Sequence, residues 1–364
     1  MSDKVLNIIV IGLGHQSLED HLPAIQESKK YNLVGIIDIN EKHAKKIAKE
    51  YQTISAQTYS ELKSKIITKI DVALIAVPHG EYLKIIKEVA ADKIDIIKEK
   101  PFAISLREAS ELKDVVRKNN ISLFVTLQRR YNPIFKSFEQ LVKRIDKIYA
   151  IEARYTMNIA DLSSGWRAVK DVAHGGALAD MGYHYIDLLV WYFGLPDSIT
   201  CKISTGNRKE QQYNVEDTAF VDFSYNDMAN DDERILGNLV VSRVYPEKDE
   251  YLVAYGSNGS VSVKRGELTR LNIAGQEVEH LSRIGGWPSA IIDQLEDFHE
   301  KIINGEYRGK IIDEYMEQVS FLEASYVSAE MHKMENPINY FNKLKEGQYN
   351  EKTRNFWWRE NSKR

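Results

Sequence analysis

Short apolar runs rich in Val and Ile alternate with helical patterns through the first third of the chain. Strands separated by helices of this length predict right-handed crossovers between the parallel strands of one sheet. We therefore predict an N-terminal doubly wound α/β domain over residues 1–126. Its strands are expected at Val5–Ile11, Leu33–Asp38, Asp71–Val77, Ile94–Lys98 and Ile121–Thr126, and its helices at Leu18–Lys30, Glu41–Tyr51, Gly80–Ala91 and Leu106–Lys118.

The pattern changes after residue 126, where a helix near 132–144 precedes a series of strand-like runs. Turn residues such as Asn258-Gly259 separate neighbouring runs, and consecutive strands with tight turns predict a mostly antiparallel sheet. We expect a C-terminal α+β domain over 127–364, with an open sheet and two late helices, of which the second returns to the first domain. The expected elements are strands Lys147–Met157, Ser198–Ser204, Glu216–Tyr225, Ile235–Val244, Tyr251–Tyr255, Ser260–Lys264 and Glu267–Ile273, then helices Ser289–Ile303 and Asp313–Met334.

Composition narrows the class of protein. With 364 residues, 43% hydrophobic and 28% charged, the chain resembles an ordinary globular protein, and its net charge of −4 offers no basic surface for nucleic acid. Cys201 is the only cysteine, which excludes an internal disulfide framework and a cysteine-based zinc cluster. The run Val5–Ile11 is too short for a signal peptide, and no apolar stretch approaches the roughly 20 residues of a membrane span. We expect a cytoplasmic protein without a nucleic-acid or membrane partner.

A glycine turn, Gly12-Leu13-Gly14, follows the first expected strand and precedes the first helix. In this context the two glycines allow a tight turn and the close approach of a pyrophosphate to the N-terminus of a helix. Ser17 stands where a third glycine is usual, which exchanges one small residue for another. The turn predicts a Rossmann domain that binds a dinucleotide, although a plain strand-to-helix turn is the structural alternative.

Asp38 ends the second expected strand, at the place where a carboxylate can accept hydrogen bonds from the adenosine ribose hydroxyls. A carboxylate there repels a 2′-phosphate, and no cation follows before Lys42. Asp38 therefore favours NAD over NADP. Its alternative role is to begin the turn Asp38–Asn40.

Glu99-Lys100-Pro101 lies at the carboxyl end of the strand before it, the edge where open α/β sheets bind ligands. A lysine there can donate to a substrate hydroxyl and stabilise a developing alkoxide, and Pro101 fixes the neighbouring backbone, with a cis bond as one option.

A second polar group stands in the helical stretch Gly175–Asp187. Asp180 and His184 are four residues apart and share one helical face, with Asp187 one turn further on. An imidazole beside a carboxylate can move a proton near neutral pH. The alternative is a core histidine whose hydrogen bond is satisfied by Asp180.

Taken in order, these motifs resemble the glucose–fructose oxidoreductase, inositol dehydrogenase and rhizopine-catabolism (Gfo/Idh/MocA) family over nearly the whole chain. One departure is the segment Pro78–Tyr82. Many members carry a histidine a few residues after the Val-Pro or Thr-Pro, whereas this chain has Pro78-His79-Gly80-Glu81-Tyr82, so the contacts of this segment with the nicotinamide are left undecided. The resemblance is carried by Gly12-x-Gly14, Asp38, Ala76-Val77-Pro78, Glu99-Lys100-Pro101, Arg130-Tyr131-x-Pro133, Trp166-Arg167 and the stretch from Gly175-Gly176 through Asp180, Gly182 and His184 to Asp187.

The resemblance implies a NAD(P)-dependent dehydrogenase or ketoreductase that exchanges a hydride with a secondary hydroxyl or ketone of a sugar, sugar derivative or inositol. It implies that Lys100, Asp180 and His184 are catalytic, with His184 as the base, that no metal is required, and that the open sheet forms a homodimer or homotetramer. NAD is the expected cofactor, NADP the less favoured one. The cofactor-binding residues are expected to be Gly12, Leu13, Gly14, His15, Asp38, Ile39, Val77, Pro78, Glu99 and Lys100.

The substrate pocket is expected to draw on aromatic faces and planar hydrogen-bonding groups, and the two arginines in it could also meet a phosphate or carboxylate. The candidates are Arg130, Tyr155, Asn158, Trp166 and Arg167, each of which could instead be a surface or interdomain residue. Two other functions stay open: a nucleotide-binding regulator of the same fold without turnover, and an enzyme that uses NAD transiently to cleave or epimerise a glycoside. Trp357 and Trp358 are expected to pack on a domain or subunit surface.

Overall fold

The computed structural model describes residues 4–227, 230–282 and 287–347 and divides the chain into two compact units. The first unit comprises Met1–Phe102, Glu111–Tyr131 and Gly286–Ile312, and the second comprises Ala103–Ser110, Asn132–Gly285 and Asp313–Arg364. Trp357 and Trp358 lie outside the described residues, so their expected packing stays a prediction.

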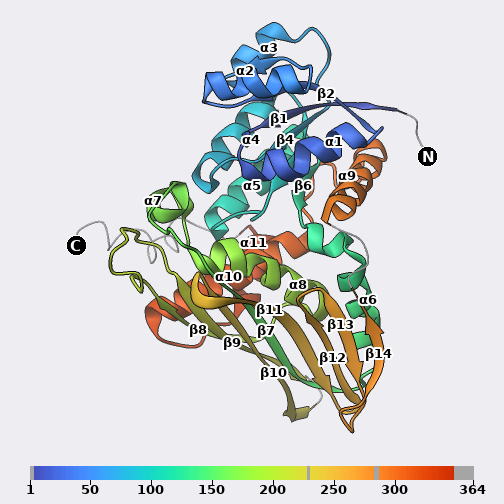
Figure 1. Ribbon diagram of the computed structural model, residues 1–364, viewed down its shortest axis with the longest axis vertical. Helices are drawn as coiled ribbons and strands as arrows, with labels where there is room; N and C mark the ends of the chain where they lie inside the picture. The colour runs from blue at the N-terminus through green and yellow to red at the C-terminus, as the bar shows by residue number, and fades with distance from the viewer. Residues whose placement is uncertain (1–3, 228–229, 283–286, 348–364) are drawn as a thin grey trace. The chain divides into compact units, whose positions relative to one another are not determined.

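The first unit contains a parallel sheet of six strands in the order β3-β2-β1-β4-β5-β6 (Figure 1). This order reverses between β1 and β4, so the carboxyl ends of these two strands form the switch point where doubly wound sheets bind ligands. The predicted α/β class is confirmed. The strands are β1 (Leu6–Ile11), β2 (Tyr31–Ile37), β3 (Ser55–Ala56), β4 (Val72–Ile75), β5 (Asp95–Glu99) and β6 (Leu123–Thr126).

Helices joined to these strands supply the rest of the unit. The sequence pattern did not predict β3 or α3, because the strand has 2 residues and the helix only 7. The helices are α1 (Leu22–Glu27), α2 (Glu41–Glu50), α3 (Tyr59–Lys65), α4 (Tyr82–Ala91), α5 (Leu106–Asn119), whose residues are divided between the two units, and α9 (Trp287–Ile303), with short helical turns at Ser17–His21, His79–Glu81 and Gln128–Tyr131.

The late helix of the first unit is α9. Its residues Leu295 and Phe298 are buried with Ile8, Leu22 and Phe124 in one hydrophobic core, and α9 lies beside α1 (Figure 1). The sequence pattern assigned the return to the following helix, which belongs to the second unit. Both helices are long and partly apolar, so their patterns alone did not tell which core each one covers.

The second unit is built on a sheet of eight strands in the order β14-β13-β12-β11-β7-β10-β9-β8. All neighbouring strands are antiparallel except β10 and β7, which confirms the predicted mostly antiparallel sheet. The strands are β7 (Ile148–Asn158), β8 (Ser198–Ser204), β9 (Thr218–Asp227), β10 (Asn230–Ser242), β11 (Val244–Gly256), β12 (Gly259–Lys264), β13 (Glu267–Leu271) and β14 (Glu277–Leu281).

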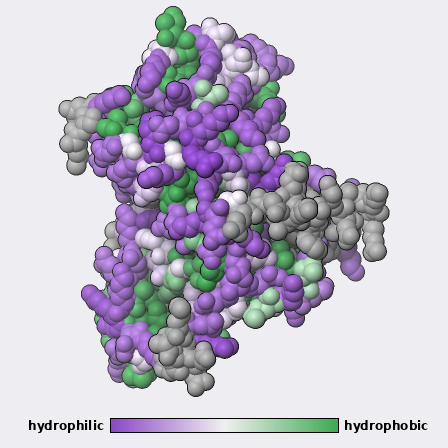
Figure 2. All heavy atoms as spheres, turned by 180° about the vertical axis from the view of Figure 1, so that it is seen from behind, coloured by the Kyte–Doolittle hydropathy of each residue, from purple (hydrophilic) through white to green (hydrophobic). Residues whose placement is uncertain are grey.

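Helices pack against this sheet: α8 contacts β7, α10 contacts β8, and α6 contacts β12 and β13 (Figure 1). Phe220 and Leu236 keep 46% and 61% of their surface exposed. On the face seen in Figure 2, hydrophilic residues predominate and hydrophobic ones form small groups. The helices are α6 (Pro133–Val142), α7 (Lys170–Ala173), α8 (Tyr183–Phe193), α10 (Asp313–Met331) and α11 (Pro337–Lys345), with short helical turns at Trp166–Ala168 and Leu178–Gly182.

Candidate active site

The glycine turn after β1 leaves room for a ligand. Gly12 has a φ of +91°, and a Cβ there would lie 2.2 Å from the carbonyl oxygen of Ala76, so the fold itself requires this glycine. At Gly14 a Cβ would meet no atom of the described residues within 4 Å, so packing does not require the second glycine. The first N–H groups of a helix have no acceptor within that helix, although the Leu18 N–H here donates to the carbonyl of Gly14 at 3.1 Å. The open space and these donors fit a pyrophosphate.

Ser17 takes the place of the third glycine without loss of packing. Its side chain is buried, and its hydroxyl donates to the carbonyl of Gly12 at 2.6 Å. The helix expected at 18–30 is in fact a π-helical turn, Ser17–His21, followed by α1, which ends at Glu27. Pro23 stands at the start of α1, where its missing N–H is tolerated.

Asp38 is bound to the glycine turn. One carboxylate oxygen accepts the Leu13 N–H at 2.9 Å, and the other accepts the Asn40 N–H at 2.8 Å. The imidazole of His43, which the sequence did not single out, contacts the carbonyl of Leu13 at 3.0 Å through Nε2. The structure thus brings Asp38 beside Leu13, while the remaining lone pairs of the carboxylate can still accept ribose hydroxyls.

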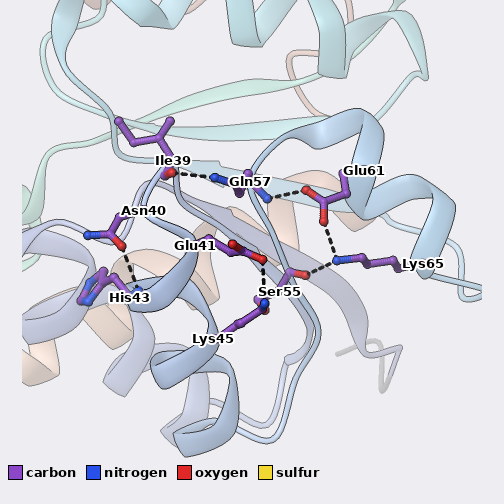
Figure 3. A network of polar contacts seen from close by, with 9 residues as sticks. All are labelled: Ile39, Asn40, Glu41, His43, Lys45, Ser55, Gln57, Glu61 and Lys65. Atoms are coloured by element: carbon purple, nitrogen blue, oxygen red, sulfur yellow. Dashed lines mark hydrogen bonds and ion pairs between the residues drawn. The ribbon is translucent and has the colours of Figure 1, made fainter.

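Helices α2 and α3, near the loop after Asp38, carry paired charges (Figure 3). Lys45 contacts Glu41 at 2.6 Å, and Lys65 contacts Glu61 at the same distance. The side chain of Ile39 is 88% exposed, and its carbonyl accepts a hydrogen bond from Gln57. The two lysine charges near this loop are therefore already offset by carboxylates.

Lys100 lies on a turn that is held in place by a second lysine, the buried Lys98. The fully buried Lys98 donates to the carbonyls of Pro101 and Phe102, at 3.1 Å for the latter, and its ammonium lies 3.8 Å from the centre of the Tyr82 ring. The Lys100–Pro101 bond is cis, and Lys100 itself is half-buried. Lys98 had no signal in the sequence, because nothing distinguishes it from a surface lysine before the fold is known.

Glu99 connects this turn to the first helical segment. Its Oε1 lies 2.8 Å from His21 Nε2 and accepts the Thr126 hydroxyl at 2.7 Å, while Oε2 accepts the Lys100 N–H. Burial alone would raise the pKa of Glu99, but the His21 hydrogen bond and the charges of His21 and Lys100 outweigh it, so this pKa lies below its usual value. Both oxygens of the Glu99 carboxylate are therefore fixed in position by hydrogen bonds.

The remaining cofactor candidates lie near the same switch point. Val77 and Pro78 follow β4, and Val77 Cγ1 would be 3.0 Å from a Cβ at Gly12. His15, directly after Gly14, is exposed. His79 is buried and stacks on Tyr82, with ring centres 6.5 Å apart.

In the second unit, Asp180 lies in the π-helical turn Leu178–Gly182 and His184 in the first turn of α8. One oxygen of Asp180 accepts hydrogen bonds from Arg167 Nε at 3.0 Å and from Arg243 at 2.9 Å. The sequence foresaw neither ion pair. The half-buried ring of His184 lies 6.4 Å from that of Tyr155, centre to centre.

Glu216 holds the segment in front of Asp180. It accepts the N–H groups of Gly176 at 2.8 Å and Leu178 at 3.0 Å, and the Tyr326 hydroxyl at 2.8 Å. Burial raises the pKa of Glu216 more than the hydrogen bonds and the charge of Arg243 lower it. A Cβ at Gly176 would lie 1.9 Å from the carbonyl oxygen of Glu216, so the contact requires glycine.

Asp187 belongs to the core, since its side chain is 1% exposed and accepts a hydrogen bond from Gln318 at 2.7 Å. Gln318 in turn accepts the hydroxyl of Tyr183 at 2.6 Å.

Four of the five substrate candidates lie in the second unit. Trp166 and Arg167 stack, with the guanidinium 4.4 Å from the ring centre, and Arg167 contacts Asp180. Asn158 accepts a hydrogen bond from Arg208 at 2.6 Å. Tyr155, Trp166 and Arg167 thus gather around the segment of Asp180 and His184, whereas Arg130 belongs to the first unit.

Within the described ranges, no group of three or more His, Cys, Asp or Glu side chains could hold a metal ion. The helices of that same part of the chain include none with the length and hydropathy needed to cross a membrane.

Family models match both parts of the chain. The model described as "Oxidoreductase family, NAD-binding Rossmann fold" matches residues 6–127, and the model for the GFO/IDH/MocA C-terminal domain matches residues 139–262. The chain belongs to the Gfo/Idh/MocA family. It is therefore an oxidoreductase-family protein with an NAD-binding Rossmann domain.

Individual relatives are distant. Oxidoreductase P35 of Formosa agariphila is 25% identical over 59% of this chain and 67% of its own length. Glucose-6-phosphate 3-dehydrogenase of Bacillus subtilis is 26% identical over 63% of this chain and 65% of its own. The chain thus matches about two thirds of the length of these relatives.

Solved structures match almost the whole chain. GenD2 from gentamicin A biosynthesis, in complex with NAD, has a TM-score of 0.77 at 20% identity and covers 92% of this chain and 96% of its own. Levoglucosan dehydrogenase with NADH and levoglucosan has a TM-score of 0.78 at 20% identity, covering 92% and 99%. At this identity the likeness shows the fold.

Proposed function

We propose that this protein is an NAD-dependent dehydrogenase or ketoreductase acting on a secondary hydroxyl or ketone of a sugar, sugar derivative or inositol. The observation that carries the proposal is the cluster of His184, Asp180, Tyr155 and Arg167, in a chain whose other unit is an NAD-binding domain. An imidazole, a carboxylate and an aromatic face are the groups that bind a polyol and take its proton.

In the proposed mechanism, His184 accepts the proton of the reacting hydroxyl through its neutral imidazole. Lys100 donates to the same oxygen and lowers the energy of the developing alkoxide. Asp180, held by Arg243, positions the substrate or the imidazole. Bound NAD supplies the hydride acceptor. Glu99 and Lys98 act on the reaction only by holding the turn that carries Lys100.

NAD is the proposed cofactor, with Gly12, Leu13, Gly14 and His15 at the pyrophosphate and Asp38 at the adenosine ribose. The carboxylate of Asp38 disfavours a 2′-phosphate. Lys45 and Lys65, which could otherwise attract that phosphate, are paired with glutamates. The exposed Ile39 offers an apolar contact for adenine, and Val77, Pro78 and Lys100 would contact the nicotinamide end.

We also propose a homodimer or homotetramer formed through the open sheet of the second unit. Phe220 and Leu236 lie on neighbouring strands and stay exposed, although both are large and apolar. Burying them between subunits would remove apolar surface from water.

The test is NADH absorbance with the purified protein, NAD and a panel of sugars, sugar acids, sugar phosphates and inositols, combined with product analysis. The proposal expects NADH and the matching keto product from at least one substrate. NAD binding without turnover would favour a regulatory protein. A cleaved or epimerised product without net NADH would favour transient use of NAD.

A further inference from the structure

Two contacts hold the side chain of Arg167, and the edge of its guanidinium that carries the two terminal nitrogens takes part in no hydrogen bond within the described part of the chain. Its Nε donates to Asp180 at 3.0 Å, and its guanidinium stacks on the indole of Trp166 at 4.4 Å from the ring centre. Both contacts come from the second unit. Together they fix the plane and the direction of a side chain that is otherwise 53% exposed.

The two terminal nitrogens of Arg167 make no hydrogen bond with the residues that the structure describes. A guanidinium carries five N–H donors, and one of them is used here. The four others lie on its two terminal nitrogens, whose paired N–H groups match the two oxygens of a carboxylate or a phosphate. Arg167 is thus a preorganised fork beside the proposed catalytic segment.

Asp180 does not need Arg167 for charge balance. The same carboxylate oxygen accepts a hydrogen bond from Arg243, which is 3% exposed and also donates to the Gly176 carbonyl at 3.2 Å. Arg243 also acts on the buried Glu216, because its charge lowers the pKa of that carboxyl group. The buried arginine therefore serves the fold, and Arg167 is the guanidinium of this pair that reaches solvent.

We propose that Arg167 binds an acid group of the substrate, so that the substrate is a sugar or cyclitol bearing a carboxylate or a phosphate. This inference rests on the proposed function, because it places the acid in the site where Asp180 and His184 meet the reacting sugar. A neutral polyol would leave the fork unpaired, whereas an acid would accept two charge-assisted hydrogen bonds from it.

The experiment compares neutral sugars with their acid counterparts: glucose with glucuronate and with glucose 6-phosphate, and myo-inositol with its monophosphate. Wild type, Arg167→Lys and Arg167→Ala are assayed for NADH formation, and binding is measured by calorimetry with NAD present. Arg144→Ala is the matched control, because Arg144 also pairs with a carboxylate at 3.0 Å and is 59% exposed.

We expect Arg167→Ala to raise the KM and the Kd of the preferred acid by about 10- to 100-fold, the usual effect of losing hydrogen bonds to a charged group. Its kcat should change less than about threefold, since Arg167 does not touch the reacting atoms. The KM and Kd of Arg167→Lys should lie between those of wild type and Arg167→Ala, because lysine keeps the positive charge but lacks the paired N–H groups of the guanidinium. Arg144→Ala should behave as wild type. Comparing glucuronate with glucose 6-phosphate identifies whether the site binds a carboxylate or a phosphate.

The outcomes separate this inference from the proposed function. Turnover of neutral sugars alone, or an equal effect of Arg167→Ala on neutral and acid sugars, overturns the acid-binding role while oxidation stands. Acid binding that depends on Arg167 without any NADH supports the role and overturns the oxidation. If neither acids nor neutral sugars bind or react, both proposals fail.

Discussion

Each unit holds its proposed catalytic segment with one buried glutamate, and the two glutamates differ in their surroundings. Glu99 holds the turn of Lys100 and contacts the imidazole of His21 at 2.8 Å. Glu216 holds the segment before Asp180, mostly through backbone N–H groups and a tyrosine hydroxyl.

The pKa values of these glutamates move in opposite directions. Burial tends to raise both, but at Glu99 the hydrogen bond and charge of His21 reverse the shift, while at Glu216 burial wins. Arg243 only partly offsets that burial, since its guanidinium donates to Asp180 and the Gly176 carbonyl. The comparison shows that a direct imidazole partner, rather than depth alone, decides the direction in which the pKa of a buried carboxylate moves.

The largest expected effect concerns the side chains that the two segments present. Lys100→Ala and His184→Ala should each lower turnover by at least about 10²-fold, because they remove the alkoxide donor and the base. NADH binding, measured by fluorescence titration, should stay nearly unchanged. His280→Ala, in an exposed histidine of β14, is the control. Near-normal turnover in either variant would remove that residue from the mechanism.

The next largest expected effect is a loss of stability when the close backbone contacts of Gly12 and Gly176 are disturbed. Gly12→Ala and Gly176→Ala should each cost about 2 to 4 kcal/mol of unfolding free energy, because the new Cβ would overlap a backbone carbonyl. Gly14→Ala should leave urea stability within about 0.5 kcal/mol and weaken NADH binding, since only a ligand occupies that space. Equal stability losses in all three variants would contradict this assignment.

The opposite pKa shifts predict opposite pH dependences. At Glu99 the folded pKa lies below the reference value of 4.5, so its contribution is present above that pH and is lost as the pH falls through the folded pKa. At Glu216 the folded pKa lies above 4.5, so its contribution is present below that pH and is lost as the pH rises through the folded pKa.

Urea denaturation of wild type, Glu99→Gln and Glu216→Gln between about pH 2.5 and 8 measures this contrast, because Glu99 loses its contribution only below pH 4.5. The advantage of wild type over Glu99→Gln should shrink toward acid, and its advantage over Glu216→Gln should shrink toward alkali, each by about 1.5 to 3 kcal/mol at most. Parallel curves for the two variants would show that His21 does not distinguish the sites.

The smallest expected effect is on cofactor choice in the first unit. Asp38→Ser should weaken NAD binding by about tenfold and improve NADP binding, because it removes the ribose acceptor and the charge that repels a 2′-phosphate. Titration of both cofactors measures the change. A wild type that prefers NADP, together with an unaltered Asp38→Ser variant, would show that Asp38 only supports the turn through Leu13 and Asn40.

Much of the first unit could be predicted, because its signals are local. A β-strand, the turn Gly12–Gly14 and a helix follow each other directly, and the carboxyl ends of parallel strands share one edge of the sheet. The structure places Asp38 against this turn, where its carboxylate accepts the Leu13 N–H. The split of the first helix was missed, since the π-helical turn has only 5 residues, too few for its longer period to appear in the apolar pattern.

The sequence by itself determined the two fold classes and the family, and it supplied the residues that we propose to carry chemistry. Only the tertiary structure decided their partners: His21 for Glu99 across 78 positions, Glu216 for Gly176 across 40, and Arg243 for Asp180 across 63. A periodic pattern records whether a side chain is buried, but not which distant charge or donor it meets there. The partner of a buried polar side chain depends on how the packed helices and strands place a few polar atoms in a region of low dielectric constant. There an unpaired polar group costs free energy, and a paired group is fixed in position by its hydrogen bond.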